Sequence, residues 1–184
     1  MKSASSNLLR GFPPIATSRA NCLILGSMPG VDSLRAQQYY AHPRNAFWPI
    51  MGELCGATPS LSYDARKQRL NRAGIAVWDV IASCRRSGSL DSKIDRHSIV
   101  VNHFEKFFCE YSKITRIFFN GATAEALFTR YVRPSLKVRE FEYRRLPSTS
   151  SAYAGMGFEA KGEAWSVVIN PVAIDVPVKT KSRA

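Results

Sequence analysis

The sequence predicts an α/β fold of three layers, in which helices cover both faces of a central, mainly parallel sheet of four strands. Short, continuous apolar runs are typical of strands that are buried on both faces. Such a run lies at 22–26, a second strand of this kind is expected at 75–81, and further strands are expected at 113–121 and 138–148. Helical patterns separate them, and parallel strands need crossover connections of this kind.

The first half of the chain contains two strands and the connection between them. CLILG at 22–26 leads into the turn GSMPG, whose glycines allow a sharp bend. AFWPIMGELC at 46–55 has helical spacing and follows Asn45, a residue type that favours the helix N-cap. SYDARKQRLNRAG at 62–74 begins at a capping Ser and ends at a Gly, as helices do. IAVWDVI at 75–81 is then the second strand.

The second half repeats this alternation. HFEKFFCEY at 103–111 places its aromatic residues on one helical face, with Asn102 as a candidate cap. KITRIFFNG at 113–121 is the third strand, and ATAEALFTRYV after it is a helix. VREFEYRRLPS at 138–148 is the fourth strand, followed by a loop and a helix near GFEAKGEAWSVVI. We therefore expect a single αβα domain.

Charge and composition favour an anionic partner. The chain has 26 Lys and Arg against 14 Asp and Glu, a net charge of +12, and this excess favours nucleic acid over an anionic membrane surface. No apolar run is long enough to span a bilayer and no leader is visible, so we expect a cytoplasmic protein that does not bind membranes. The expected domain covers 1–184, with its core at about 12–170, a loose N-terminus at 1–11 and a basic tail at 176–184.

The cysteines and histidines show no metal-binding pattern. Zinc and iron–sulfur sites usually contain a close pair of ligands, whereas the cysteines here are scattered. They are Cys22, Cys55, Cys84 and Cys109, and the histidines are His42, His97 and His103. We expect reduced thiols, no metal and no cofactor.

Polar or glycine-rich segments follow all four predicted strands. Parallel sheets place their working residues at the carboxyl ends of the strands. Here those ends carry GSMPG, then Asp79, Asn120–Gly121 and the loop PSTSSA at 147–152. We therefore expect these four segments to face one crevice.

The motifs of these segments resemble a known family. GSMPG followed by AHPRNAFW, with GIAVWDV, GSLD, FFNG and LPSTS further on, is similar to the uracil-DNA glycosylase superfamily, and most closely to its hypoxanthine-DNA (deoxyinosine) glycosylase branch. The match runs from about Phe12 to about Ile169. It implies a uracil-DNA-glycosylase-like fold and a monofunctional enzyme of base excision repair. Such an enzyme flips a deaminated base, here expected to be hypoxanthine, out of double-stranded DNA and excises it by hydrolysis.

The resemblance also implies roles for individual residues. The base would stack on Tyr40, with Phe47 as the alternative. Asn45 and Asn120 would take the catalytic roles, because Met28 stands where several branches carry an Asn or Asp that handles the attacking water, and a thioether accepts hydrogen bonds only weakly. The implied base pocket consists of Gly26, Ser27, Met28, Tyr40, His42 and Phe47. The implied DNA-binding loop consists of Pro147, Ser148, Thr149 and Ser150.

Several alternatives stay open from the residues themselves. Asn45 could serve only as a helix cap, and Asn120–Gly121 could be an ordinary strand-to-helix turn. The excised base could be uracil, xanthine or a mismatched base, or the same fold could be a DNA-binding module without catalysis. A serine hydrolase using Ser27 or Ser33 is poorly supported, because no His follows residue 103.

We expect a monomer. The arginines expected either to follow the DNA backbone or to form a solvated face are Arg85, Arg86, Arg139, Arg144 and Arg145.

Overall fold

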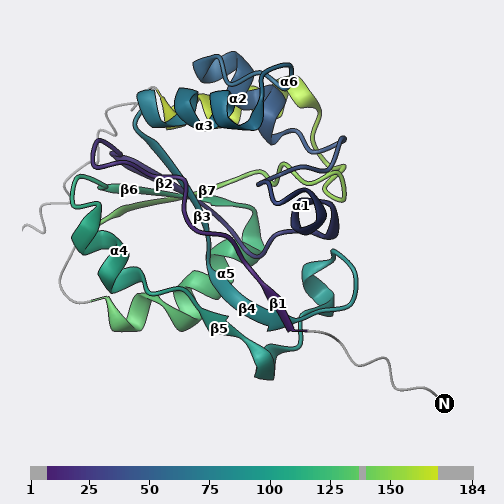
Figure 1. The fold of residues 1–184 in the computed structure, drawn as a ribbon, viewed down its shortest axis with the longest axis vertical. Helices are drawn as coiled ribbons and strands as arrows, with labels where there is room; N and C mark the ends of the chain where they lie inside the picture. Colours follow the sequence, from purple (N-terminus) through teal and green to yellow (C-terminus); the bar gives the residue numbers. More distant parts are fainter. Residues whose placement is uncertain (1–7, 137–139, 170–184) are drawn as a thin grey trace, which may run out of the picture.

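A computed structural model describes residues 8–136 and 140–169, and the parallel sheet forms its centre (Figure 1). Four parallel strands pair in the order β3-β2-β6-β7. Their bounds are Cys22–Gly26 for β2, Ile75–Asp79 for β3, Arg116–Asn120 for β6 and Glu142–Leu146 for β7. Every residue of β2 and β3 is buried, as expected where helices cover both faces of a sheet. The predicted four-stranded sheet is confirmed.

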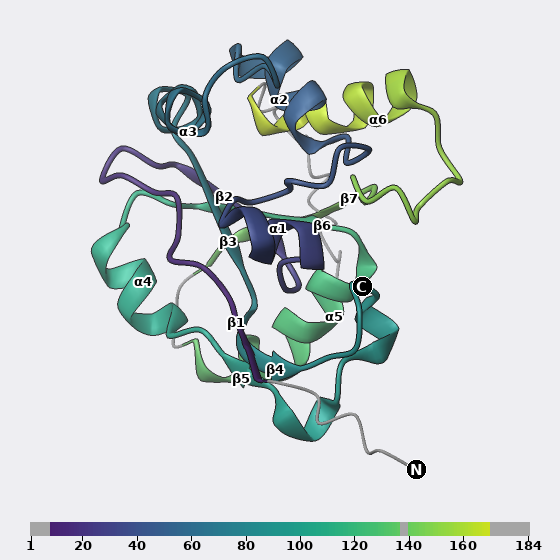
Figure 2. The same ribbon diagram turned by 45° about the vertical axis from the view of Figure 1, so that its right-hand side comes forward.

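Helices cover both faces of this sheet. Figures 1 and 2 show α2, α3 and α6 on one side and α4 and α5 on the other, so the three-layer prediction is also confirmed. The helices are α1 (Val31–Ala36), α2 (Phe47–Cys55), α3 (Tyr63–Arg72), α4 (Phe104–Glu110), α5 (Ala122–Tyr131) and α6 (Phe158–Trp165). Short 3-10 turns are η1 (Asp91–Lys93), η2 (Arg96–Ser98), η3 (Arg133–Ser135) and η4 (Ser166–Val168). Among the described residues, no helix is both long and apolar enough to cross a membrane.

A second, antiparallel sheet was not predicted. It consists of β1 (Leu8–Arg10), β4 (Ile81–Arg85) and β5 (Val100–Val101), in the order β1-β4-β5. The expected single strand at 75–81 is therefore divided: the chain leaves the parallel sheet after Asp79 and enters this smaller sheet at Ile81.

The smaller sheet also corrects the expectation of a loose N-terminus at 1–11. Leu9 pairs with Cys84 in the β1–β4 ladder. Just beyond it, the Trp78 indole N–H donates to the Phe12 carbonyl at 3.1 Å, and Ile15 pairs with Val77. Residues 8–15 are thus tied to the sheets, and the rest of the expected loose segment, like the basic tail at 176–184, lies outside the described residues.

Helix ends follow the sequence signals in one case and depart from them in another. Ser62 caps α3 by accepting the Ala65 N–H at 3.2 Å, and the chain leaves through Gly74 at a φ of 73°. Asn102 was expected to cap α4, but that position belongs to His103. The Asn102 amide instead donates to the Asp79 carbonyl at 2.8 Å, so it fixes the end of β3.

Candidate active site

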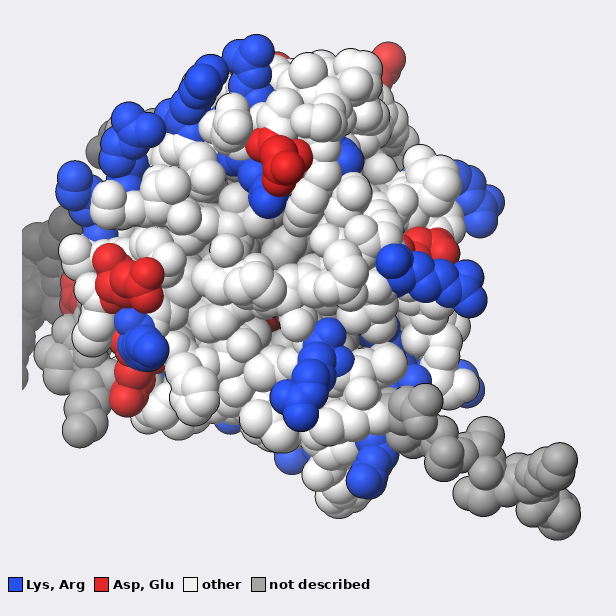
Figure 3. Space-filling view, in the orientation of Figure 1, with Lys and Arg blue, Asp and Glu red and all other residues white. Residues whose placement is uncertain are grey.

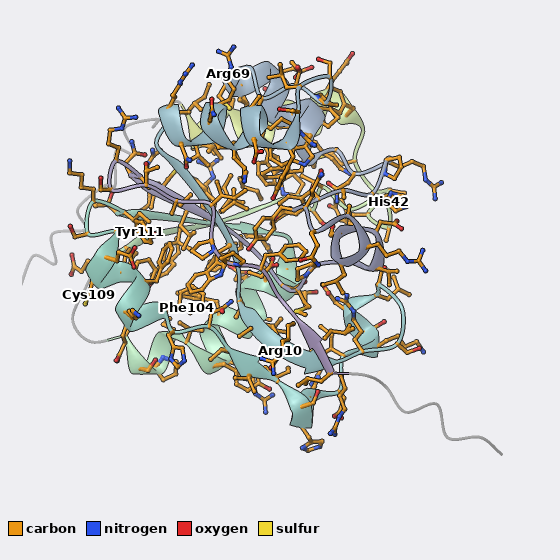
Figure 4. All side chains as sticks on the ribbon, in the orientation of Figure 1. Arg10, His42, Arg69, Phe104, Cys109 and Tyr111 are labelled. Carbon is orange, nitrogen blue, oxygen red and sulfur yellow. The ribbon has the colours of Figure 1, made fainter. Side chains whose placement is uncertain are left out.

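The carboxyl ends of the four parallel strands surround a cavity of about 660 Å³, a size typical of small-molecule sites. The cavity lies near α1, and Figure 4 shows His42 on this side of the molecule. All four segments expected to share a crevice contribute to its wall. The sequence-predicted residues that line it are Gly26, Ser27, Met28, Tyr40, His42, Asn45, Asn120, Ser148, Thr149 and Ser150.

The two adjacent tyrosines, Tyr39 and Tyr40, have different positions. Tyr39 is buried; its backbone N–H donates to the Tyr63 hydroxyl, and its carbonyl accepts from the Trp48 indole at 2.8 Å. Tyr40 is only half-buried and lines the cavity. Its φ of 55° lies in the left-handed region, which is unfavourable for an aromatic residue. The surrounding packing therefore holds Tyr40 in this orientation at some cost in free energy.

Phe47 supports Tyr40 and does not line the cavity. The two rings stack with centroids 4.0 Å apart and an interplanar angle of 24°. Phe47 is fully buried, and it makes further edge contacts with Trp48 and Trp165. The expectation that Phe47 contacts a ligand directly is therefore wrong: as the first residue of α2, it turns into the core.

Asn45 lines the cavity and also supports the start of α2. Its side-chain oxygen accepts the Phe47 backbone N–H at 2.9 Å. Because an N–H group needs an oxygen partner, this contact fixes which end of the amide is the oxygen. The NH₂ group and one lone pair of the oxygen stay available toward the cavity.

The side-chain amide of Asn120 forms two hydrogen bonds with Thr149. Its NH₂ group donates to the Thr149 hydroxyl and its oxygen accepts the Thr149 backbone N–H, both at 2.8 Å. Since β6 and the loop after β7 are thereby joined, the Asn120 amide has a fixed orientation at the cavity wall.

Asp79 ends β3 at the buried end of the cavity. Its side chain is almost fully buried and leans over Gly26, where a Cβ atom would lie 2.2 Å from the Asp79 Oδ1. Burial raises the pKa of Asp79 to about 8; the nearby Asp91 carboxylate raises it further and the Arg86 guanidinium opposes both effects. The carboxyl is therefore mostly protonated at neutral pH.

Two buried polar atoms at the cavity have no partner at normal hydrogen-bond geometry among the described residues, although the Asn120 side chain lies close enough to the Tyr40 hydroxyl to lower its pKa. They are the Tyr40 hydroxyl and the Asp79 Oδ2, and both atoms are buried. Burial, followed by the nearby Asp79, also raises the pKa of the Tyr40 phenol. An unpartnered buried polar atom carries a desolvation penalty. Both atoms are thus suited to a ligand that brings its own polar groups.

The turn after β2 is anchored by the buried Arg86 and the half-buried Asp91, a pair that the sequence did not reveal. The Ser27 hydroxyl donates to both Asp91 oxygens, at 2.8 and 2.9 Å. The Arg86 guanidinium donates to the Met28 and Pro29 carbonyls and lies 4.0 Å from Asp91. Arg86 is buried, so its predicted contact with the DNA backbone is wrong. Ser27 likewise contacts a carboxylate rather than a histidine, which leaves the serine hydrolase without a catalytic base.

His42 and Met28 line the cavity through side chains that are already engaged. The His42 Nδ1 accepts the Arg44 N–H at 3.1 Å, and its Nε2 lies 3.8 Å from an Asp32 oxygen. Met28 is buried against Ile81 and Cys84. Neither contact gives these residues a chemical role.

The loop after β7 divides into supporting and accessible residues. The Pro147 carbonyl accepts the Trp165 indole N–H at 2.9 Å, and Pro147 does not line the cavity. Thr149 is 1% exposed and holds Asn120. Direct contact with DNA is therefore not supported for the buried Thr149, whereas for the half-buried Pro147 it stays a prediction. Ser148 and Ser150 remain half-buried at the cavity wall.

Basic side chains are spread over the surface. Figure 3 shows Lys and Arg in a row along the upper left edge, over α3, where Figure 4 labels Arg69. Arg85 and Arg144 are exposed, whereas Arg145 pairs with Glu125 at 3.1 Å. Arg139 lies outside the described residues.

Among the described residues, no group of three or more His, Cys, Asp or Glu side chains is placed to hold a metal ion. Cys22 and Cys84 are buried, and all four cysteines are free thiols.

Comparisons with known proteins agree with this arrangement. Residues 13–171 match the model of the uracil DNA glycosylase superfamily. Two proteins named hypoxanthine DNA glycosylase, from Methanosarcina barkeri and Methanosarcina acetivorans, are 35% and 36% identical over 144 residues, which cover 78% of this chain and 87% of each relative. A solution NMR structure of a Methanosarcina acetivorans protein, described as a candidate uracil DNA glycosylase, has a TM-score of 0.70 at 30% identity. That match covers 88% of this chain and 99% of the other.

Proposed function

Because the chain belongs to the uracil DNA glycosylase superfamily and is a DNA glycosylase of DNA repair, we propose that it excises hypoxanthine from deoxyinosine in double-stranded DNA. The two relatives named hypoxanthine DNA glycosylase support this choice of base. In the proposed reaction water attacks C1′ of the sugar, the glycosidic bond breaks and the base leaves. The chain would act as a monofunctional monomer, without covalent attachment to the sugar.

One observation carries the proposal: the cavity combines a supported aromatic face with polar atoms that lack partners. The Tyr40 ring is backed by Phe47 at 4.0 Å, and the Tyr40 hydroxyl and Asp79 Oδ2 are buried without hydrogen bonds of normal geometry in the described chain. A flipped purine is flat and carries polar groups on its edge. A flipped purine would therefore stack on the Tyr40 ring and form hydrogen bonds with these polar atoms through its edge.

The charge that develops on the leaving base determines what the site must provide. Breaking the bond leaves an oxocarbenium-like sugar and an electron-rich base. The protonated Asp79 carboxyl would donate a hydrogen bond to the O6 or a ring nitrogen of hypoxanthine. Backbone N–H groups of the turn 26–30 would add further donors. Donors fixed before the reaction lower the barrier because they need little reorganisation.

The attacking water would be oriented by Asn45. The remaining lone pair of its oxygen can accept from the water, while the contact to Phe47 keeps the amide in place. An amide cannot take a proton at neutral pH, so Asn45 acts by orientation. Asn120, held by Thr149, would fix the opposite wall and direct its second N–H toward the base or sugar.

The test is a panel of duplexes that each carry one damaged base: hypoxanthine, xanthine or uracil. After incubation, alkali converts abasic sites into strand breaks. We expect cleavage of the hypoxanthine duplex at the highest rate. Cleavage of the uracil duplex alone would show that the excised base is uracil and not hypoxanthine. No abasic product from any duplex would favour a DNA-binding module without catalysis.

A further inference from the structure

The loop between β7 and α6 forms one wall of the cavity, and its two halves are held differently. Figure 2 shows this loop extending outward on the right-hand side of the molecule. The inner half, 147–149, is fixed to the body of the protein, because the Ala46 N–H donates to the Thr149 carbonyl at 2.9 Å and Asn120 binds Thr149. The outer half, 150–156, contributes four residues to the cavity wall: Ser150, Ser151, Ala152 and Tyr153.

The outer half has few contacts of its own to keep it in place. The Ala152 N–H donates to the Ser150 hydroxyl at 3.3 Å, and the Tyr153 N–H donates to the Ser150 carbonyl at 3.0 Å, so both bonds stay within the loop. Residues 151–155 are exposed. Among the described residues, one hydrogen bond reaches the outer half from beyond the loop: the Lys161 ammonium donates to the Tyr153 carbonyl at 2.9 Å.

Lys161 is an unusual residue to find buried. It lies in α6 and is 6% exposed, whereas lysine is almost never fully buried unless it is paired, because its charge loses hydration. No Asp or Glu of the described chain forms an ion pair with it. Its ammonium instead contacts the Tyr153 carbonyl and lies 5.2 Å from the Tyr153 ring centroid, which is within the range of a cation–π contact. Both contacts are with the outer half of the loop.

We propose that Lys161 is a positioning residue, whose ammonium holds the outer half of the loop in place as a cavity wall before DNA binds. This inference rests on the proposed function. Ordering a loop during binding costs conformational entropy, and a loop that is already ordered avoids that cost. Lys161 does not line the cavity, so its ammonium touches neither the base nor the sugar. It therefore supports the binding of DNA and not the chemical step.

This role predicts a separation of binding from chemistry. Single-turnover excision from a hypoxanthine duplex, measured at increasing protein concentration, gives a maximal rate and a half-saturating concentration. Lys161→Met keeps a long side chain and removes the charge, and Lys161→Arg keeps a cation with N–H donors. Lys106→Met is the matched control, because Lys106 is an exposed lysine on α4, on the other face of the sheet from α6 (Figure 1).

We expect Lys161→Met to raise the half-saturating concentration about tenfold and to change the maximal rate less than about twofold. Lys161→Arg should recover most of the affinity, and Lys106→Met should match wild type. The ratio between Lys161→Met and wild type should be the same at about 50 and about 200 mM salt, because a positioning residue releases no counterions. A ratio that shrinks as salt rises would show a direct phosphate contact and would overturn the positioning role. An unchanged half-saturating concentration would also overturn it.

Limited digestion with chymotrypsin tests the loop without DNA. Chymotrypsin cleaves after aromatic residues, and Tyr153 is exposed. Lys161→Met should be cut after Tyr153 about fivefold faster than wild type, because the outer half opens more often, and equal cutting would contradict the proposal. Thermal unfolding checks that each variant is folded, and Lys161→Leu takes the place of Lys161→Met if that variant does not fold. Failure of the proposed function looks different: wild type then releases no hypoxanthine, while the digestion still reports whether Lys161 holds the loop.

Discussion

Replacing Asp79 with Asn should change how the stability of the protein depends on pH. In the folded chain the pKa of Asp79 is about 8, against 3.8 for an ordinary Asp. Between these values the folded state binds a proton that the unfolded state has released. The free energy of unfolding of the wild type therefore falls as pH rises through this window.

The size of this effect follows from the two pKa values. From pH 3.8 to pH 7 the titration of Asp79 lowers the free energy of unfolding of the wild type by about 1.4 kcal/mol per pH unit. The loss of stability therefore reaches about 4 kcal/mol at pH 7, and it levels off above pH 8 at about 6 kcal/mol. Asn has nearly the same shape and does not titrate. Asp79→Asn should thus match the wild type near pH 4 and exceed its stability by about 4 kcal/mol at pH 7.

Urea unfolding at pH 4, 5, 6, 7 and 8 measures the difference, followed by tryptophan fluorescence. The other titrating groups are common to both proteins, so the difference between the two curves isolates Asp79. Asp64→Asn, which removes an exposed carboxylate outside the cavity, controls for the loss of one negative charge. A constant gap between wild type and Asp79→Asn from pH 4 to pH 8 would refute the assignment of a buried, protonated carboxyl.

Four further predictions address the site. Asn45→Ala should reduce excision at least a hundredfold, as measured by single-turnover assay, while DNA affinity stays within twofold and the lost contact to α2 costs about 1 kcal/mol in urea unfolding. Tyr40→Ala should slow excision about 10- to 100-fold by removing the stacking face, whereas Tyr40→Phe keeps the ring, loses only the hydroxyl contact with the base edge and should slow excision less; equal losses would argue against stacking. Excision by wild type should fall as pH rises through about 8, where Asp79 loses its proton, and Asp79→Asn should not show this fall in a pH–rate profile. Arg86→Met should destabilise the fold by about 1–3 kcal/mol in urea unfolding, because it leaves the Met28 and Pro29 carbonyls without their donor, and no measurable loss would contradict the anchoring role.

The parallel sheet and the position of the cavity could be predicted because each depends on strong, local signals. The strand at 22–26 is an uninterrupted apolar run, and such runs belong in parallel sheets covered on both faces. Once the strands are parallel, their carboxyl ends share one edge. Asn45, Asn120 and Tyr40 were placed together by this rule and by the family resemblance, and the structure brings all three to one cavity.

The antiparallel sheet could not be predicted, because its strands carry little pattern. β1 has three residues and β5 has two, and none of them is buried. Their pairing depends on β4, which continues from β3 after a single residue. Strands this short are defined by their tertiary partners and not by local propensity.

The sequence also could not show which side chains face the cavity. Phe47 and Tyr40 are both aromatic and close in sequence, and only the packing against Trp165 shows that Phe47 is the inner ring. Arg86 was expected either to follow the DNA backbone or to form a solvated face. Its burial depends on carbonyls and on a carboxylate from distant segments, which a linear pattern does not reveal.

The measurement that tests the central claim most directly is the stoichiometry of free base to abasic sites in a hypoxanthine duplex treated with the wild-type protein. Chromatography quantifies the released hypoxanthine, and gels run with and without alkali quantify abasic sites and strand breaks. The account predicts one free hypoxanthine for each alkali-labile site and no strand break before alkali. Intact hypoxanthine in the recovered DNA, or strand breaks that form without alkali, would contradict it.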